Sequence, residues 1–195
     1  MSRTAQISRD TAETQVQLTL DLDGSGSGER TTGVGFFDHL LDALAKHGQL
    51  DLDLRVDGDL ETGPHHTVED TGLALGQALD EALADRAGIR RFGHASVPMD
   101  EALASCSIDV SGRPHTAFAA SFPAARVEGF DTDLTEEFVR AVANAAKLTV
   151  HLRVEAGVNT HHMVEAAFKA FARALMQAIE LDPTDGGIAS TKGLI

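Results

Sequence analysis

The chain has 195 residues, enough for one or two compact domains with a sizeable core. Its 30 acidic residues against 16 basic ones give a formal net charge of −14, which disfavours a nucleic-acid partner because a phosphate backbone requires a concentrated basic face. It has no run of 18 apolar residues, no apolar signal core and a single cysteine, Cys106, so we expect a cytoplasmic protein without disulfides or a thiolate zinc site.

The first half predicts two strands, a helix, a third strand and a longer helix. Residues 16–22 alternate apolar and polar side chains, the period of a half-buried strand, and a glycine-rich loop follows. We expect a short strand at residues 31–34 and a helix over residues 39–46, with Asp38 as its cap. Residues 50–56 alternate again, and the turn at Gly63-Pro64 leads into a helix with an apolar leucine and alanine face that extends to about residue 87.

The second half repeats this order. Strands are expected at residues 108–110 and 117–122, and a helix at residues 133–146, where Asp133 and Glu136 have capping-box spacing. A further strand at residues 148–154 precedes a long helix at residues 161–181. No linker separates the halves, so the sequence predicts one fused globular unit of the α+β class. Its internally duplicated strand-strand-helix-strand-helix half-repeats are expected at residues 1–97 and 98–195.

A short string of metal-ligand residues occurs twice, as HHTVE at residues 65–69 and HHMVE at residues 161–165, at the start of each long helix. Adjacent helical residues diverge by about 100°. We therefore expect each string to give one histidine and its glutamate to one ion, and its other histidine to a second. Imidazole and carboxylate without thiolate suit Mn, Fe, Co, Ni or Zn and disfavour Mg and Ca. Because the string occurs twice, we expect either two ions related by a pseudo-twofold axis or sites that are completed across subunit contacts.

An alignment of the halves extends the ligand set. An offset of 98 residues places Asp38-His39 on Glu136-Glu137, and an offset of 88 places Glu13 on Glu101. Each half thus offers an acid before its first strand, a candidate ligand at the start of the short helix and HHxxE at the start of the long one. The predicted metal ligands are His39, His65, His66, Glu69, Glu137, His161, His162 and Glu165.

The few basic residues indicate an anionic substrate. The C-terminal residues 186–193 combine a flexible glycine backbone with hydroxyls and an ammonium group, which can surround an anion; a disordered terminus is the alternative. Beside a metal centre, this favours a small phosphorylated substrate. His47, at the end of the short helix, is either a C-terminal cap or a substrate contact. The candidate substrate-binding residues are Arg91, Arg113, Lys169, Ser190, Lys192 and His47.

Over essentially its full length, the chain resembles the imidazoleglycerol-phosphate dehydratase family of histidine biosynthesis. The matching strings include FDHLLD at residues 37–42, HHTVED at 65–70, RRFG at 90–93, PMDEAL at 98–103, DVSGRP at 109–114, HHMVEAAFKAFARAL at 161–175 and STKG at 190–193. The resemblance implies helices packed between two β-sheets, a 24-subunit particle that completes its sites between protomers, and two Mn²⁺ ions per site. It also implies conversion of imidazole glycerol phosphate to imidazole acetol phosphate and water, with Glu13 as the acid/base carboxylate and the basic residues above, with Ser190, as phosphate contacts.

Two positions depart from the family pattern. Many relatives carry histidine where this chain has Glu137, and glutamine where it has Ala43. Because the internal alignment marks Glu137 as a ligand position, the first change favours replacement of a ligand over its loss.

Two other classes of function, and one hypothesis about the charge, stay open. A dinuclear metal phosphatase would use similar ligands to activate water. A metal-storage assembly of the ferritin type would place Glu-x-x-His on four long helices, whereas here HHxxE alternates with strands. The acidic excess with only four lysines is typical of a salt-rich cytoplasm, where ions screen self-repulsion; an ordinarily acidic cytosolic enzyme is the alternative.

Overall fold

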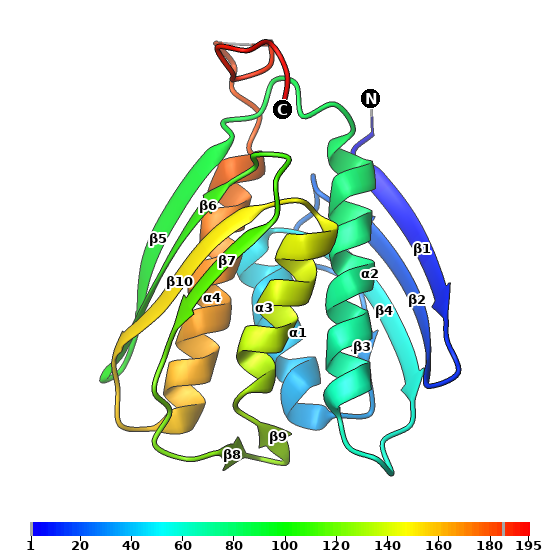
Figure 1. Cartoon of the computed structure of the whole chain (residues 1–195), viewed down its shortest axis with the longest axis vertical. Coiled ribbons are helices and arrows are strands. Elements are labelled where there is room, and N and C mark those ends of the chain that lie inside the picture. Colours follow the sequence, from blue (N-terminus) through cyan, green and yellow to red (C-terminus); the bar gives the residue numbers. More distant parts are fainter. Residues whose placement is uncertain (1, 185) are drawn as a thin grey trace.

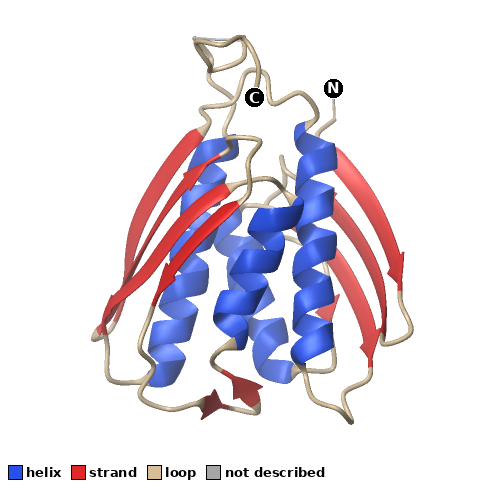
Figure 2. Cartoon of the chain, in the orientation of Figure 1, coloured by secondary structure: helices blue, strands red, loops and turns tan. Residues whose placement is uncertain are grey.

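The computed structural model describes residues 2–184 and 186–195, and across these residues two four-stranded sheets enclose four helices. The first half contains β1 Thr4–Asp10, β2 Thr14–Asp21, β3 Arg30–Thr31, α1 Gly35–Gly48, β4 Asp51–Gly58 and α2 His65–Leu83. The second half contains β5 Phe92–Met99, β6 Ala102–Asp109, β7 His115–Ala119, β8 Arg126–Val127, β9 Phe130–Asp131, α3 Leu134–Ala145, β10 Thr149–Ala156 and α4 Thr160–Ile179. Figures 1 and 2 show the helices as a layer between the sheets, which confirms the predicted fold class.

The two sheets share one topology. Their strand orders are β1-β2-β4-β3 and β5-β6-β10-β7. In each, an antiparallel hairpin is extended by an antiparallel central strand, and a short parallel strand, β3 or β7, forms the far edge. A small hairpin of β8 and β9 is additional to the second half.

Each four-stranded sheet contains one strand more than we predicted. β1 and β5 are edge strands, and the alternation of their side chains is weak because only part of one face is apolar. In β5 only Gly93 is buried, and Pro98 is compatible with an edge position, where its missing N–H is tolerated. Residues 97 and 98, between which we placed the boundary of the half-repeats, lie inside β5.

One predicted helix cap is wrong, and a second residue takes the cap position without the expected side-chain bond. α1 begins at Gly35, so Asp38 lies within its first turn, where its carboxylate accepts hydrogen bonds from the backbone N–H and hydroxyl of Thr32 at 2.8 and 2.6 Å. The helix starts early because Phe36 and Phe37 are buried on its inner face. In α3, Asp133 is the N-cap residue, but its side chain makes no capping bond, and Glu136 pairs with Arg140 instead of completing a capping box.

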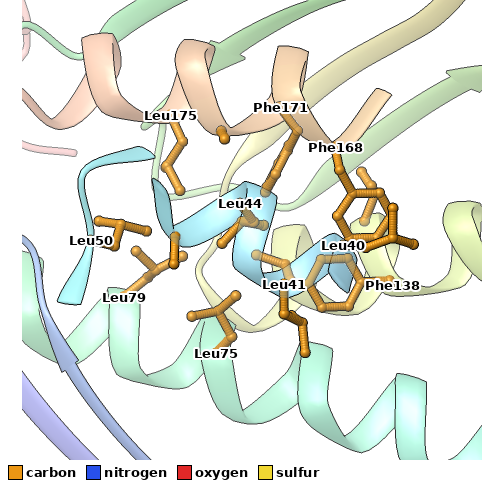
Figure 3. Close-up of a cluster of buried hydrophobic side chains, with 14 of the residues drawn as sticks. Leu40, Leu41, Leu44, Leu50, Leu75, Leu79, Phe138, Phe168, Phe171 and Leu175 are labelled. Carbon is orange, nitrogen blue, oxygen red and sulfur yellow. The ribbon is translucent and has the colours of Figure 1, made fainter. Parts of the chain in front are cut away.

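The core is built around α1. Its Leu40, Leu41 and Leu44 are fully buried and lie between side chains of α2 and α4 (Figure 3). The cluster in Figure 3 also contains Leu50, Leu75, Leu79, Phe138, Phe168, Phe171 and Leu175. Cys106 is buried in β6, where desolvation raises the pKa of its thiol, so it packs as a small apolar residue.

Close packing of α2 on α3 depends on two glycines. A Cβ at Gly76 would lie 2.5 Å from the carbonyl oxygen of Val142, and a Cβ at Gly72 would lie 2.7 Å from the Cβ of Ala141. Both distances are shorter than real side chains allow, so these helices approach through bare backbone. Within the described residues, no helix combines the length and apolarity needed to cross a membrane.

The helices share one polarity, and this places the candidate site. All four begin at the lower end of the molecule in Figure 1, whereas the C-terminal tail lies at the upper end. The predicted ligands at the helix starts therefore collect at one end. Residues of the predicted anion site near the tail collect at the other.

Candidate metal centre and active site

Three predicted ligands from α1 and α4 converge at the lower end. The Nε2 atoms of His39 and His161 lie 3.1 and 3.2 Å from Oε2 of Glu165. His161 and Glu165 share one face of α4 because they are four residues apart. Within the part of the chain that the structure describes, only these three residues bring three ligand atoms within 4.8 Å of one another. Two imidazole nitrogens and one carboxylate oxygen form a donor set that fits a first-row divalent ion.

Glu165 is the anionic centre of this group. Its side chain is only 8% exposed, and Lys169 Nζ lies 2.6 Å from its Oε1. Burial alone would favour the neutral acid, but hydrogen bonds from Lys169 and His39 lower the pKa of Glu165 to about 2. The group therefore presents a carboxylate near neutral pH, as metal ligation requires.

The first-half string lies at the start of α2 and is more open. Nε2 of His65 is 3.6 Å from Oε2 of Glu69, whose side chain is 41% exposed. His66 Nδ1 lies 3.0 Å from Asp59 and 3.8 Å from Oε2 of Glu13, which comes from the turn between β1 and β2. Within one copy these residues do not join the three-ligand group at Glu165.

The remaining members of the predicted ligand set are His162 and Glu137. His162 Nδ1 lies 2.8 Å from Oε2 of Glu101. Its hydrogen bond, together with backbone N–H donors from Asn159 and Val158, lowers the pKa of Glu101 to about 2. Glu137 lies half-buried in the first turn of α3, outside the three-ligand group.

Four predicted phosphate contacts meet at the opposite end. Arg91, Arg113, Ser190 and Lys192 line one cavity of about 590 Å³. Arg91 is held there by Asp109, at 2.7 Å, and donates to the carbonyl oxygen of Ala189 at 2.7 Å. This hydrogen-bonded ion pair raises the pKa of Arg91 and keeps its guanidinium charged. The cavity therefore combines fixed positive charge with the hydroxyl and backbone of the tail.

Comparisons with known proteins decide the family. Residues 32–175 match the family model described as imidazoleglycerol-phosphate dehydratase. Curated relatives of that name from Granulibacter bethesdensis and Geobacillus kaustophilus are 54% and 52% identical, with 100% of each chain covered. The chain belongs to the imidazoleglycerol-phosphate dehydratase family. It is accordingly a hydro-lyase, as predicted, and the comparisons give no support to the phosphatase alternative.

Solved dehydratase structures share the fold. The enzyme from Staphylococcus aureus superposes with a TM-score of 0.84 at 40% identity, covering 92% of this chain and 99% of that one. The enzyme from Pyrococcus furiosus, solved in complex with a compound named (S)-C348, also gives 0.84 at 35% identity, covering 97% and 100%. The predicted helices between two sheets agree with these structures.

In this dehydratase chain, two candidate substrate residues lie apart from the cavity near the tail. Lys169 contacts Glu165 and the sulfur of Met99, so it lies beside the three-ligand group at the lower end, which we call the metal end. His47 lies in the last turn of α1, where burial, and then the charges of Lys169 and Arg173, lower its pKa. The predicted substrate contacts are thus divided between the cavity at the tail and positions along α1 and α4.

Sequence reasoning missed three carboxylates beside the histidines. Asp59 and Glu128 lie 3.0 and 3.1 Å from Nδ1 of His66 and His161, and neither was singled out. Glu101 was noted only as the counterpart of Glu13. No spacing rule marks Asp59 or Glu128, since both lie in loops whose paths depend on the folded chain.

Proposed function

We propose that this chain dehydrates imidazole glycerol phosphate at a dinuclear metal centre completed between copies of the chain. The activity, a dehydration in L-histidine biosynthesis, follows from family membership. The observation that carries the site is the convergence of His39, His161 and Glu165, three residues from two distant segments, on one point.

The donor set supports two Mn²⁺ ions per site as the cofactor. The three-ligand group would hold one ion, and the first-half string with His65, His66 and Glu69 would contribute to the other. His162 and Glu137 complete the proposed ligand set. A bound divalent ion would supply Lewis-acid stabilisation of negative charge on the substrate. Carboxylate and imidazole donors also accept Fe, Co, Ni and Zn, so the choice of Mn²⁺ depends on metal analysis.

The separation of the two ends supports a site shared between copies. α4 has 20 residues and therefore extends about 30 Å. The ligand group lies at its start, whereas the cavity with Arg91 and Arg113 lies beyond its end. A molecule as small as imidazole glycerol phosphate cannot reach both ends of one copy. We infer a homo-oligomer in which another copy brings its cavity to the metal end, and we propose 24 subunits in the cytoplasm.

The chain's own side chains would position the substrate and move its proton. Arg91, Arg113, Ser190 and Lys192 would bind the phosphate, and Lys169 and His47 would contact substrate nearer the metal end. Glu13, whose side chain is 55% exposed beside His66, would take the proton from the carbon next to the departing hydroxyl. Phosphate binding would hold the flexible chain of the substrate in reactive geometry.

An assay for imidazole acetol phosphate before and after chelation tests this function. We expect turnover with the ion, loss of nearly all turnover after a strong chelator, and recovery when Mn²⁺ is restored. The same treatment should reduce the mass of the assembly measured by light scattering, because the proposed ions join separate copies. Release of inorganic phosphate without a ketone product would instead establish the phosphatase alternative. Full activity in protein with no metal by elemental analysis would contradict the metal centre.

A further inference from the structure

Glu13 and Glu101 take matching positions in the two halves, but their surroundings differ. Glu101 Oε2 lies 2.8 Å from Nδ1 of His162, and its Oε1 accepts the backbone N–H groups of Val158 and Asn159 at 3.1 and 2.8 Å. Glu13 Oε2 is 3.8 Å from His66 Nδ1, beyond hydrogen-bond distance. Both oxygens of Glu101 are therefore engaged, which makes it unsuited to accept a substrate proton.

Two other carboxylates also lie beside Nδ1 of a histidine in this region. Both oxygens of Asp59 lie 3.0 to 3.1 Å from Nδ1 of His66. Glu128 Oε1 lies 3.1 Å from Nδ1 of His161. The Nε2 atom of His161 then faces Glu165 in the three-ligand group. Three carboxylates outside the predicted ligand set thus face Nδ1, and in His161 the opposite nitrogen points to the metal site.

A carboxylate beside Nδ1 decides which nitrogen of a neutral histidine ring carries the proton. A neutral ring carries one N–H, and a hydrogen-bond acceptor beside one nitrogen places the proton there, which leaves the lone pair on the other nitrogen. Carboxylates beside metal-binding histidines act in this way and orient the ring. We propose that Glu101 is a positioning residue that holds His162 in the Nδ1–H tautomer and reserves its Nε2 for a divalent ion. Asp59 performs the same task for His66.

This inference rests on the proposed metal centre and deepens it. It also separates two carboxylates that the internal alignment makes equivalent. Glu13 would act on the substrate, whereas Glu101 would act only through His162. The first half needs a separate carboxylate, Asp59, for the positioning task, which leaves Glu13 available.

The E101Q variant tests whether Glu101 sets the tautomer of His162, because it changes the contact with His162 and keeps the contacts with the backbone. The amide oxygen can continue to accept from Val158 and Asn159, while the NH₂ group faces Nδ1 of His162 and favours a proton on Nε2. We expect Mn²⁺ to bind about 10- to 100-fold more weakly in chelator competition without substrate. The melting temperature of the metal-free chain should fall only slightly, because the amide keeps the two backbone contacts and loses only the one to His162. ¹⁵N NMR of the metal-free chain, with labelled histidine, should show His162 changing from the Nδ1–H to the Nε2–H form.

Two further variants keep the test decisive. D59N should weaken Mn²⁺ binding and change the tautomer of His66, and it replaces E101Q as the deciding variant if that protein does not fold. E61Q, at an exposed glutamate in the same loop as Asp59, should change neither. Equal Mn²⁺ affinity with an unchanged tautomer in E101Q would overturn this inference alone. Absence of Mn²⁺ binding by the unsubstituted chain would overturn the proposed centre and this inference with it.

Discussion

The two histidine strings have the same residue pattern, but their glutamates differ in burial and in the contacts that they make. In the second half, Glu165 is buried and contacted by His39, His161 and Lys169. In the first half, Glu69 is exposed and its nearest histidine nitrogen is 3.6 Å away. One string is thus part of a preorganised group within a single copy, whereas the other faces outward.

Counterpart residues explain the difference. At the offset of 96 residues that relates the strings, Lys169 corresponds to Leu73, so the first half has no ammonium group beside its glutamate. His39 of α1 joins the second-half string, whereas its counterpart on α3 is Glu137. We infer that the halves derive from one duplicated unit and that an outward string on one copy meets a preorganised group on another.

Mixing two inactive variants would test this pairing most directly. Glu69→Gln and Glu165→Gln should each lose nearly all turnover, because each removes a proposed carboxylate ligand from a different half. Co-expressed with different tags and purified through both, they should regain about a quarter of wild-type activity, since random assembly pairs two intact halves at that frequency. Turnover of imidazole glycerol phosphate by the hybrid particle is the measurement.

A control separates recovery from contamination. A double variant that carries both substitutions, co-expressed with either single variant, cannot assemble an intact pair of halves and should stay inactive. Hybrid particles of the two single variants that fold and bind Mn²⁺ but show no recovery would place both halves of a site in one copy and would contradict a site shared between copies.

Glu13 provides the next largest effect. Glu13→Gln should lower kcat about 10²- to 10⁴-fold, because the amide cannot accept the substrate proton. Mn²⁺ affinity and KM should stay near wild type, since Glu13 lies beyond hydrogen-bond distance of His66. Steady-state kinetics with chelator competition measures both quantities. Glu101→Gln is the matched variant, with the opposite expectation of weakened ion binding. Full activity of Glu13→Gln would remove it from the acid/base role.

Residue pattern predicts most of this fold because buried strands and helices carry strong periodicity. β2, β4 and β10 follow alternating apolar side chains, and α2 and α4 follow apolar faces that agree with the predicted helices. β1 and β5 escape prediction because an edge strand buries few side chains and leaves little pattern. The start of α1 escapes prediction because the buried Phe36 and Phe37, rather than Asp38, decide where that helix begins.

The site is less predictable than the fold. The repeated HHxxE strings identify His161 and Glu165, and the internal alignment adds His39, because ligand spacing on a helix is local. Asp59 and Glu128 depend on loops that fold back onto α2 and α4, which no local pattern records. Roles for the predicted ligands, and the division into half-repeats, stay predictions until variants are measured.

Helix packing also differs between the halves and gives a smaller expected effect. Gly72 and Gly76 of α2 correspond to Phe168 and Ala172 of α4, so α4 has no glycine at the two positions where α2 meets α3 through bare backbone. Gly76→Ala should destabilise the fold by about 1–3 kcal/mol, because its Cβ meets the carbonyl oxygen of Val142. Urea unfolding of the metal-free chain measures this. Gly35→Ala, whose Cβ would meet nothing within 4 Å, is the control and should cost little. Equal stability of both variants would show that α2 and α3 can separate without cost.

The outer faces of the two sheets differ in charge and give the smallest effect. The exposed Asp53, Arg55 and Asp57 of β4 leave one net negative charge on the first sheet, whereas the charges of the exposed Arg153 and Glu155 of β10 cancel on the second. Molar NaCl shortens the Debye length to about 3 Å, so acidic self-repulsion should fall and the melting temperature should rise by about 2–4 °C. Asp57→Asn should be slightly more stable at low salt and should respond less to NaCl, which separates screening from the general effect of salt on apolar burial. A melting temperature that does not rise with NaCl would contradict the salt-rich origin of the acidic surface. An equal rise in Asp57→Asn and in the unsubstituted chain would show that repulsion on the first sheet does not cause the rise.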